Sequence, residues 1–178
     1  MQFLSSAFIL LLFVAPFHSN SITIDPTNGS DTEECLTGNG SCKTIGYVFN
    51  ETSNDTVITL VADTFEEEMG GILLQRSNIT VCGQGMTSIV TGSDSDPQTT
   101  FYCSETDDLT LKNFLVKSDG DGMLTLSSSN RITIEGVLFQ QDSIDTSEKG
   151  FIPAYILFSC TEVKITLSYD TSVADGVC

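Results

Sequence analysis

The chain contains one pair of adjacent aspartates, Asp107 and Asp108, and paired carboxylates could act on a glycosidic bond. Glycoside hydrolases use two carboxyl groups that flank the scissile bond, one as an acid and the other as a base or a nucleophile. The pair lies just ahead of Leu109, where a turn is expected, and Asp is common in turns. We therefore interpret the pair as turn residues and expect no catalytic residue in the chain.

Two further acidic segments, Asp94-Ser-Asp96 and Asp119-Gly-Asp121, could offer oxygen ligands to calcium. Neither segment has the full ligand pattern of a known calcium loop. Both are flanked by Gly, Ser or Pro, which is typical of turns. We expect no bound metal and no cofactor.

The first 21 residues have the pattern of a secretory signal peptide. An apolar run over residues 7–15 is too short to span a bilayer comfortably, and Pro16 then ends it. Small residues follow, so cleavage is expected near Ser19 or Ser21; an uncleaved anchor is the alternative. No later segment is long and apolar enough to cross a membrane, so we expect a secreted protein or one on the extracellular face of the cell.

Histidine is missing from the predicted mature chain, because the single histidine, His18, falls within the signal peptide. A Ser-His-Asp triad is therefore excluded, and a zinc site would have to use scattered cysteines alone. An even number of cysteines in an exported chain favours disulfides, and paired cysteines leave no thiol nucleophile. The six cysteines all follow the signal: Cys35, Cys42, Cys82, Cys103, Cys160 and Cys178.

The formal net charge of −17 limits the partners that the protein can have. Phosphate binding needs clustered Lys and Arg, so nucleic acid is excluded as a partner. Anionic membranes and polyanionic sugars are also disfavoured, unless calcium bridges them to the protein.

Five sequons for N-glycosylation agree with export. Four of them lie in polar, loop-like sequence, and the fifth abuts a predicted strand. The acceptors are Asn28, Asn39, Asn50 and Asn54 in the loops and Asn78 beside the strand.

A tripeptide of the form apolar-Thr-apolar recurs along the chain. Strict alternation of aliphatic residues with Thr favours strands over helices. Its occurrences are Ile22-Thr-Ile24, Ile58-Thr-Leu60, Ile79-Thr-Val81, Leu109-Thr-Leu111, Leu124-Thr-Leu126, Ile132-Thr-Ile134 and Ile165-Thr-Leu167.

Three of these tripeptides are followed at the same distance by Gly83, Asn113 or Gly136. Gly and Asn tolerate positive φ at the least cost, so we expect a left-handed turn at each of these residues. The spacing between the three frames is 30 and then 23 residues. Units of this length with short strands and turns at fixed places predict a solenoid, and a β-sandwich is the rival fold.

The segments 71–92 and 109–141 resemble the right-handed parallel β-helix of the pectin-lyase-like family. The resemblance implies coils of three short strands, with a left-handed Asn or Gly after one of them. It covers residues 57–141 well and is looser over residues 142–178.

Many members of that family are polysaccharide lyases or hydrolases, and the resemblance raises that possibility here. Their Asp pair acts with a Gly-His-Gly and an Arg-x-Lys motif, but no His remains and neither Arg76 nor Arg131 has Lys two residues later. Convergence of Asp107, Asp108 and Arg131 in one groove would favour an enzyme.

The start of the chain, residues 35–50, is expected to cap the open end of the β-helix. Ile45, Val48 and Phe49 share one face of a short amphipathic helix, and the segment is similar to the opening of large secreted or cell-surface β-helix proteins. We expect Cys35 and Cys42 to form a disulfide that closes a local loop. The other four cysteines allow three pairings, which stay open.

The predicted organisation is a signal peptide (1–21), an N-terminal cap (22–56) and parallel β-helix coils (57–178). The far end shows no amphipathic cap, so we expect the coils to be the front part of a longer protein; an irregular cap formed by the last residues is the alternative. We expect an all-β, secreted glycoprotein that binds extracellular carbohydrate or protein, or has a structural or adhesive role. The alternatives are a polysaccharide lyase or glycoside hydrolase of the same fold and a β-sandwich adhesion domain.

Overall fold

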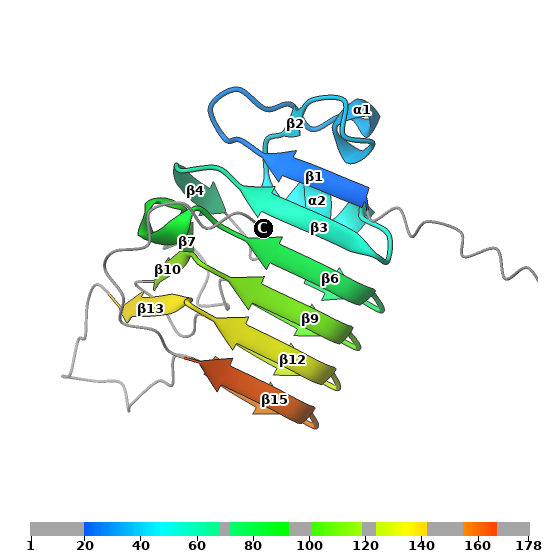
Figure 1. Cartoon of the computed structure of the whole chain (residues 1–178), viewed down its shortest axis with the longest axis vertical. Coiled ribbons are helices and arrows are strands. Elements are labelled where there is room, and N and C mark those ends of the chain that lie inside the picture. Colours follow the sequence, from blue (N-terminus) through cyan, green and yellow to red (C-terminus); the bar gives the residue numbers. More distant parts are fainter. Residues whose placement is uncertain (1–19, 68–71, 93–100, 119–123, 142–154, 167–178) are drawn as a thin grey trace, which may run out of the picture.

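The computed structural model describes residues 20–67, 72–92, 101–118, 124–141 and 155–166 (Figure 1). These residues are mostly strand, and the strands form three parallel sheets with few helices beside them. The expectation of a mostly β chain is confirmed at this level.

The largest sheet, sheet A, has seven described strands. Its spatial order is β15 (Thr161–Thr166), β12 (Asn130–Glu135), β9 (Asp107–Lys112), β6 (Ser77–Cys82), β3 (Thr56–Leu60), β1 (Asn20–Ile24) and β2 (Ser41–Cys42).

Sheets B and C have four described strands each. Sheet B has the order β13 (Leu138–Gln141), β10 (Leu115–Ser118), β7 (Ile89–Gly92) and β4 (Thr64–Glu67). Sheet C has the order β14 (Tyr155–Phe158), β11 (Leu124–Ser127), β8 (Phe101–Ser104) and β5 (Ile72–Leu74). The described helices are α1 (Glu33–Leu36), α2 (Ile45–Glu51) and the 3-10 helix η1 (Gly85–Thr87).

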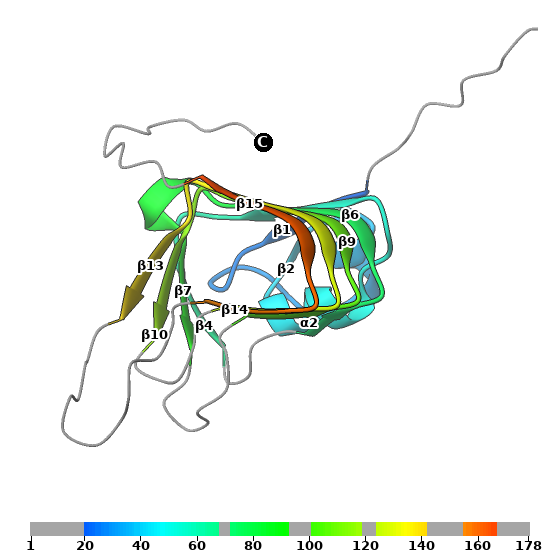
Figure 2. The ribbon, with the colours of Figure 1, turned by 90° about the horizontal axis from the view of Figure 1, so that it is seen from below.

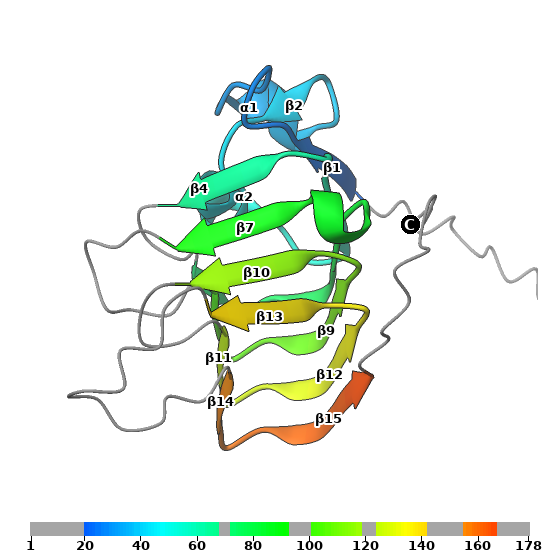
Figure 3. The same ribbon diagram turned by 90° about the vertical axis from the view of Figure 1, so that its left-hand side faces the viewer.

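From β3 onward the chain contributes strands to sheets A, B and C in turn. Strands β6, β7 and β8 lie in sheets A, B and C, and β9, β10 and β11 repeat that order. Figure 3 shows the strands of sheet B one beneath another, in the order β4, β7, β10 and β13. All pairs of described strands are parallel, whereas a β-sandwich needs antiparallel sheets.

The register of sheet A confirms the predicted frame in its central strands. Thr80 of β6 pairs with Thr110 of β9, which pairs with Thr133 of β12. The alternation therefore places one row of threonines on the outer face and aliphatic residues on the inner face of three consecutive strands.

Two of the tripeptides are shifted by two residues from the predicted frame. Ile58 pairs with Val81 rather than Ile79, and Ile165 pairs with Ile134 rather than Ile132. A shift of two residues keeps each apolar side chain on the inner face, so the hydrophobic pattern does not distinguish the two registers. A third tripeptide, over residues 124–126, lies in β11 of sheet C rather than in sheet A.

The three sheets share one hydrophobic core. Figure 2 shows the sheets themselves from the end of the stack. Aromatic rings cross this core: the ring centroids of Phe49 and Phe101 are 5.8 Å apart, and those of Phe101 and Phe114 are 5.7 Å apart. All three rings are almost fully buried, so they join α2, sheet C and the turn before sheet B. Burial of a Phe side chain contributes about 1.5–3 kcal/mol.

The turn from sheet A to sheet B confirms two of the three predicted left-handed residues. Asn113 has φ 54° and Gly136 has φ 62°. Gly83 has no positive φ, so that part of the prediction is wrong. Gly83 is instead needed for space: a Cβ there would lie 2.4 Å from the carbonyl oxygen of Asn113 and 2.7 Å from the Cβ of Phe114.

The predicted capping helix is α2. Its Ile45, Val48 and Phe49 are buried, and the helix packs against β2, β4 and β5 at one end of the sheets (Figure 1). Thr44 is the N-cap, and its hydroxyl accepts the backbone N–H of Tyr47 at 3.3 Å. The helix thus covers apolar side chains that the first strands would otherwise leave in water.

The predicted disulfide between Cys35 and Cys42 is confirmed. It joins α1 to β2, and the two Cα atoms are 5.1 Å apart. Both cysteines are buried, so the bond fixes the loop that precedes the capping helix.

Candidate functional site

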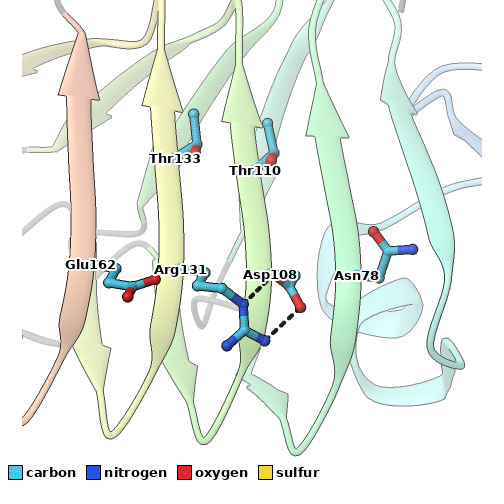
Figure 4. A pocket seen from close by; sticks show the side chains of 6 residues that line it. All are labelled: Asn78, Asp108, Thr110, Arg131, Thr133 and Glu162. Carbon is cyan, nitrogen blue, oxygen red and sulfur yellow. Dashed lines mark hydrogen bonds and ion pairs between the residues drawn. The ribbon is translucent and has the colours of Figure 1, made fainter.

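Polar side chains form a row along the outer face of sheet A, where its strands begin. Neighbouring members of the row lie on adjacent strands, as Figure 4 shows for four of them. We call this set the left-handed row because every member has φ between 53° and 58°: Asp55, Asn78, Asp108, Arg131 and Glu162.

A second left-handed residue precedes each of the last four members by three positions. These residues are Gln75, Glu105, Ser128 and Ser159, with φ between 50° and 52°. Two left-handed residues in four turn the chain sharply from sheet C into sheet A. Such a residue costs roughly 1–2 kcal/mol unless it is Gly, Asn or Asp, so the surrounding strand pairs must hold residues such as Glu105, Arg131 and Glu162 in place.

Asp108 and Arg131 form a two-point ion pair at the middle of the left-handed row. Arg131 Nε donates to Asp108 Oδ1 at 2.6 Å, and Nη2 donates to Oδ2 at 2.7 Å. Their positions are 23 residues apart in sequence but lie side by side in β9 and β12 (Figure 4). About half of each side chain is exposed, 51% for Arg131 and 45% for Asp108, so water reaches the pair.

The ion pair lies in a shallow depression of about 380 Å³ on the outer face of sheet A. Thr110 and Thr133 form its other edge, and neither hydroxyl is hydrogen-bonded to another residue within the described ranges. The full lining is Asn78, Asp108, Thr110, Arg131, Thr133 and Glu162 (Figure 4).

The ion pair sets the protonation of both partners. Hydrogen bonds from Arg131 lower the pKa of the Asp108 carboxyl below its ordinary value. The same hydrogen bonds, together with the charge of Asp108, raise the pKa of Arg131. A carboxylate that holds its charge is a poor acid, and a guanidinium that holds its proton is a poor base.

Asp107 does not join Asp108 in the depression. Its Oδ1 accepts from Asn130 Nδ2 at 3.0 Å, and Asn130 Oδ1 in turn accepts from the hydroxyl of Thr161. The two aspartates therefore face different rows of the sheet. They do not flank one bond, as the two carboxyl groups of a hydrolase do.

The other candidate residues of the sequence lie away from the depression. Arg76 donates from Nε to the backbone oxygen of Thr52 at 2.7 Å, so it ties the end of the cap to β6. The segments 94–96 and 119–121, considered for calcium, lie outside the described residues. Over the described ranges, no group of three or more His, Cys, Asp or Glu side chains could hold a metal ion.

All five predicted glycosylation acceptors are exposed: Asn28, Asn39, Asn50, Asn54 and Asn78. Asn78 alone lines the depression, where its amide donates to Asp55 Oδ1 at 2.9 Å. Glycosylation of these residues stays a prediction.

Burial makes one cysteine of the described core, Cys103, unreactive. Cys103 is a free thiol, fully buried in sheet C, and burial raises its pKa to about 12. Such a thiol remains protonated and inert. Cys82 is disulfide-bonded, as expected for an exported chain.

Most residues of the depression belong to no catalytic motif. The sequence therefore identified few of them as candidate site residues. Arg131 was considered only for an Arg-x-Lys motif, and Thr110, Thr133 and Glu162 were not singled out as site residues. A signal does exist: the in-frame segments SNIT (77–80), DDLT (107–110) and NRIT (130–133) each place two polar residues before the alternation.

The chain matches no family model, no curated protein and no solved structure. Among the residues that the structure describes, no helix has the length and apolar character needed to cross a bilayer.

Proposed function

We propose that this chain is an extracellular, N-glycosylated module with a right-handed parallel β-helix fold, which binds carbohydrate or another protein, or serves adhesion, without chemical turnover. The rotation of successive strands through sheets A, B and C supports the β-helix. Connections between parallel strands of one sheet are right-handed in about 98% of cases, which supports the handedness. The disulfides and exposed sequons support an extracellular setting.

The observation that carries the binding function is the two-point pair of Asp108 and Arg131 in the depression. Two-point pairing fixes the guanidinium plane, and its remaining N–H groups still face solvent because half of the side chain is exposed. Fixed donors beside the free hydroxyls of Thr110 and Thr133 form a preorganised polar surface. A preorganised surface binds a hydroxyl-bearing or amide-bearing partner with little loss of side-chain entropy.

The charge of the chain narrows the class of partner. A formal net charge of −17 repels polyanions, so a neutral saccharide or a neutral to cationic protein surface is favoured. The depression itself carries Asp108, Arg131 and Glu162, so its own formal charge is −1 when all three are ionised.

A polysaccharide lyase or glycoside hydrolase is the second candidate. The observation in its favour is that Asp108 and Arg131 meet in one depression although they come from different repeats. Against it, the pKa of Asp108 is lowered and that of Arg131 is raised, so neither group is tuned to transfer a proton. Asp107, the third residue that catalysis would use, is bonded to Asn130 instead.

The binding function is tested with two variants that remove one positive charge each. Arg131→Gln changes the depression, and Lys112→Gln changes an ion pair with Glu135 (3.4 Å) on the same sheet but outside the depression. Immobilised neutral polysaccharides and extracellular matrix proteins serve as probes. We expect Arg131→Gln to lose about tenfold or more in affinity, as for a bound charged side chain, and Lys112→Gln to match the wild type.

Catalysis is tested on the same wild-type sample with pectic substrates in the presence of calcium. We expect no turnover. Turnover by the wild type that disappears in Arg131→Gln would establish the enzyme instead. Binding that is equal in the wild type and in Arg131→Gln would show that the depression is not the binding surface.

A further inference from the structure

The hydroxyl of Thr52 is buried at the end of the capping helix α2 without a hydrogen-bond partner. Thr52 is only 3% exposed. Among the residues that the structure describes, its Oγ1 is the single buried side-chain oxygen or nitrogen atom that lacks a partner. A buried hydroxyl of this kind destabilises the folded state, because its hydrogen bonds to water are lost and not replaced. Such groups are rare in native structures.

The fold itself gives the Thr52 side chain no polar role. Only the backbone of Thr52 forms hydrogen bonds: its N–H donates to the oxygen of Val48 at 2.8 Å, and its oxygen accepts from Arg76 Nε at 2.7 Å. A valine could form both bonds and has the same branched shape, and it would bury no unpaired oxygen. The role of the hydroxyl therefore lies outside the folded state.

Thr56 provides the contrasting case. It is 1% exposed, and its Oγ1 donates to the backbone oxygen of Ser53 at 2.9 Å. The hydroxyl of Thr56 thus stabilises the turn that leads into β3, whereas the hydroxyl of Thr52 stabilises nothing that the structure describes.

Thr52 is also the third residue of the sequon Asn50-Glu-Thr52, and the acceptor pattern demands a hydroxyl at this position. In the folded chain Asn50 is exposed on α2, but Thr52 is buried at the helix end. Side chains two positions apart on a helix do not face each other. An enzyme that binds the Asn50 amide and the Thr52 hydroxyl together therefore cannot engage this segment once α2 has packed.

We propose that Asn50 is N-glycosylated while the cap is still unfolded, and that the Thr52 hydroxyl serves this step rather than the folded structure. The inference rests on the proposed extracellular, N-glycosylated character of the chain. The donor is an oligosaccharide on a lipid diphosphate. Its sugar C1 forms a bond to Asn50 Nδ2, which gives up one proton, and the bond from C1 to the phosphate oxygen breaks. The lipid diphosphate leaves with that electron pair.

Occupancy of the sequons is measured by mass spectrometry of the protein secreted from a eukaryotic host. We expect a glycan on Asn50 in the wild type, its loss in Thr52→Val and its presence in Thr52→Ser, which keeps the hydroxyl. A bare Asn50 beside a glycosylated Asn28 or Asn39 would overturn this inference alone. The absence of glycans from every sequon would overturn the proposed extracellular setting, and this inference with it.

The timing is tested with the unglycosylated full chain, a purified oligosaccharyltransferase and a lipid-linked oligosaccharide. We expect transfer to Asn50 when reduction and alkylation of the cysteines hold the chain unfolded. In the folded chain we expect about tenfold less transfer or lower, because α2 must first open locally. Equal transfer to both forms would show that the folded segment is accessible and would contradict the proposal.

The folded-state role is tested on unglycosylated protein, so that the variants do not differ in their glycans. Thr52→Val should leave the midpoint of thermal unfolding unchanged or raise it, because no hydrogen bond is lost. Thr56→Val is the matched control and should lower the midpoint, because the bond to Ser53 is lost. If Thr52→Val lowers the midpoint as much as Thr56→Val, the hydroxyl serves the fold and the proposal is wrong.

Discussion

Two turns of the chain lead into and out of sheet A, and both use left-handed residues, but of different kinds. The turn from sheet A to sheet B uses Asn113 and Gly136, which accept positive φ readily. The turn from sheet C to sheet A uses charged and polar residues such as Glu105, Asp108 and Arg131. The second turn therefore carries a backbone cost that the first one avoids.

Side-chain hydrogen bonds offset part of that backbone cost at the turn into sheet A. At the turn into sheet A, residues on adjacent strands bond each other, as Gln75 Nε2 does to Glu105 Oε2 at 2.8 Å and Arg131 does to Asp108. Backbone bonds between repeats occur at both turns: Asn113 N–H donates to the oxygen of Glu135 at 3.0 Å at the turn out of sheet A, and Glu105 N–H donates to the oxygen of Ser127 at 2.9 Å at the turn into it. Charged and polar side chains at left-handed positions thus form an ordered row on the surface of sheet A.

The largest expected effect concerns Gly83, the glycine of the turn into sheet B that is not left-handed. Gly83→Ala places a Cβ 2.4 Å from a backbone oxygen, and overpacking of this kind costs about 3 kcal/mol. Gly136→Ala should cost less, about 1 kcal/mol, which is the cost of its positive φ for a residue with a Cβ. Denaturant unfolding of the two variants measures the difference, and equal losses would show that the two glycines serve the same purpose.

A β-branched residue at Gly136 should reveal how strictly the turn out of sheet A requires a residue that accepts positive φ. Gly136→Val is expected to cost about 2–3 kcal/mol, since a β-branched side chain is a severe outlier at φ 62°. Asn113→Gly, at the same place in the preceding repeat, should be nearly neutral. Thermal unfolding compares them, and a neutral Gly136→Val would contradict the left-handed turn.

At position 131, in the turn into sheet A, substitution by glycine should destabilise the fold less than substitution by alanine. Arg131→Ala loses the ion pair, worth about 0.2–1 kcal/mol at this exposure, and keeps the strained φ of 53°. Arg131→Gly loses the same pair but relieves the strain, so it should be about 1 kcal/mol more stable than Arg131→Ala. In an ordinary strand the order is reversed, because Gly weakens strands. Chemical unfolding of both variants decides which order holds.

The smallest expected effect is the pH dependence of the ion pair. The pKa of Asp108 is lowered in the folded chain, so its contribution to stability is present above the ordinary value of 3.8 and is lost as pH falls through the folded pKa. Asp108→Asn should lack this component. Melting temperatures of both proteins between neutral pH and about pH 2 should converge on acidification, and parallel curves would show that the pair contributes nothing.

Local patterns in the sequence predicted the parts of the fold that depend on neighbouring residues. Alternation predicted the strands, Asn113 and Gly136 marked one turn, and the spacing of Ile45, Val48 and Phe49 predicted the capping helix. Each of these signals lies within a few residues of the structure that it specifies.

The parts that the sequence did not predict depend on contacts between repeats. The pair of Asp108 and Arg131 exists only because strands 23 residues apart lie in one register. The role of Gly83 depends on the approach of Asn113 from the next strand. Left-handed charged residues carry no propensity signal, and a register shift of two residues, as at Ile58, leaves the hydrophobic pattern unchanged.

The stacking of repeats in parallel register, on which both the fold and the depression depend, can be measured with two double-cysteine variants. Thr110 and Thr133 are paired on adjacent strands, about 4.8 Å apart, so Thr110→Cys with Thr133→Cys should form a disulfide. Thr80 and Thr133 are two strands apart, so Thr80→Cys with Thr133→Cys should not. Cross-linking in the first variant alone is the predicted result; cross-linking in the second variant, or in neither, would contradict the stacked register.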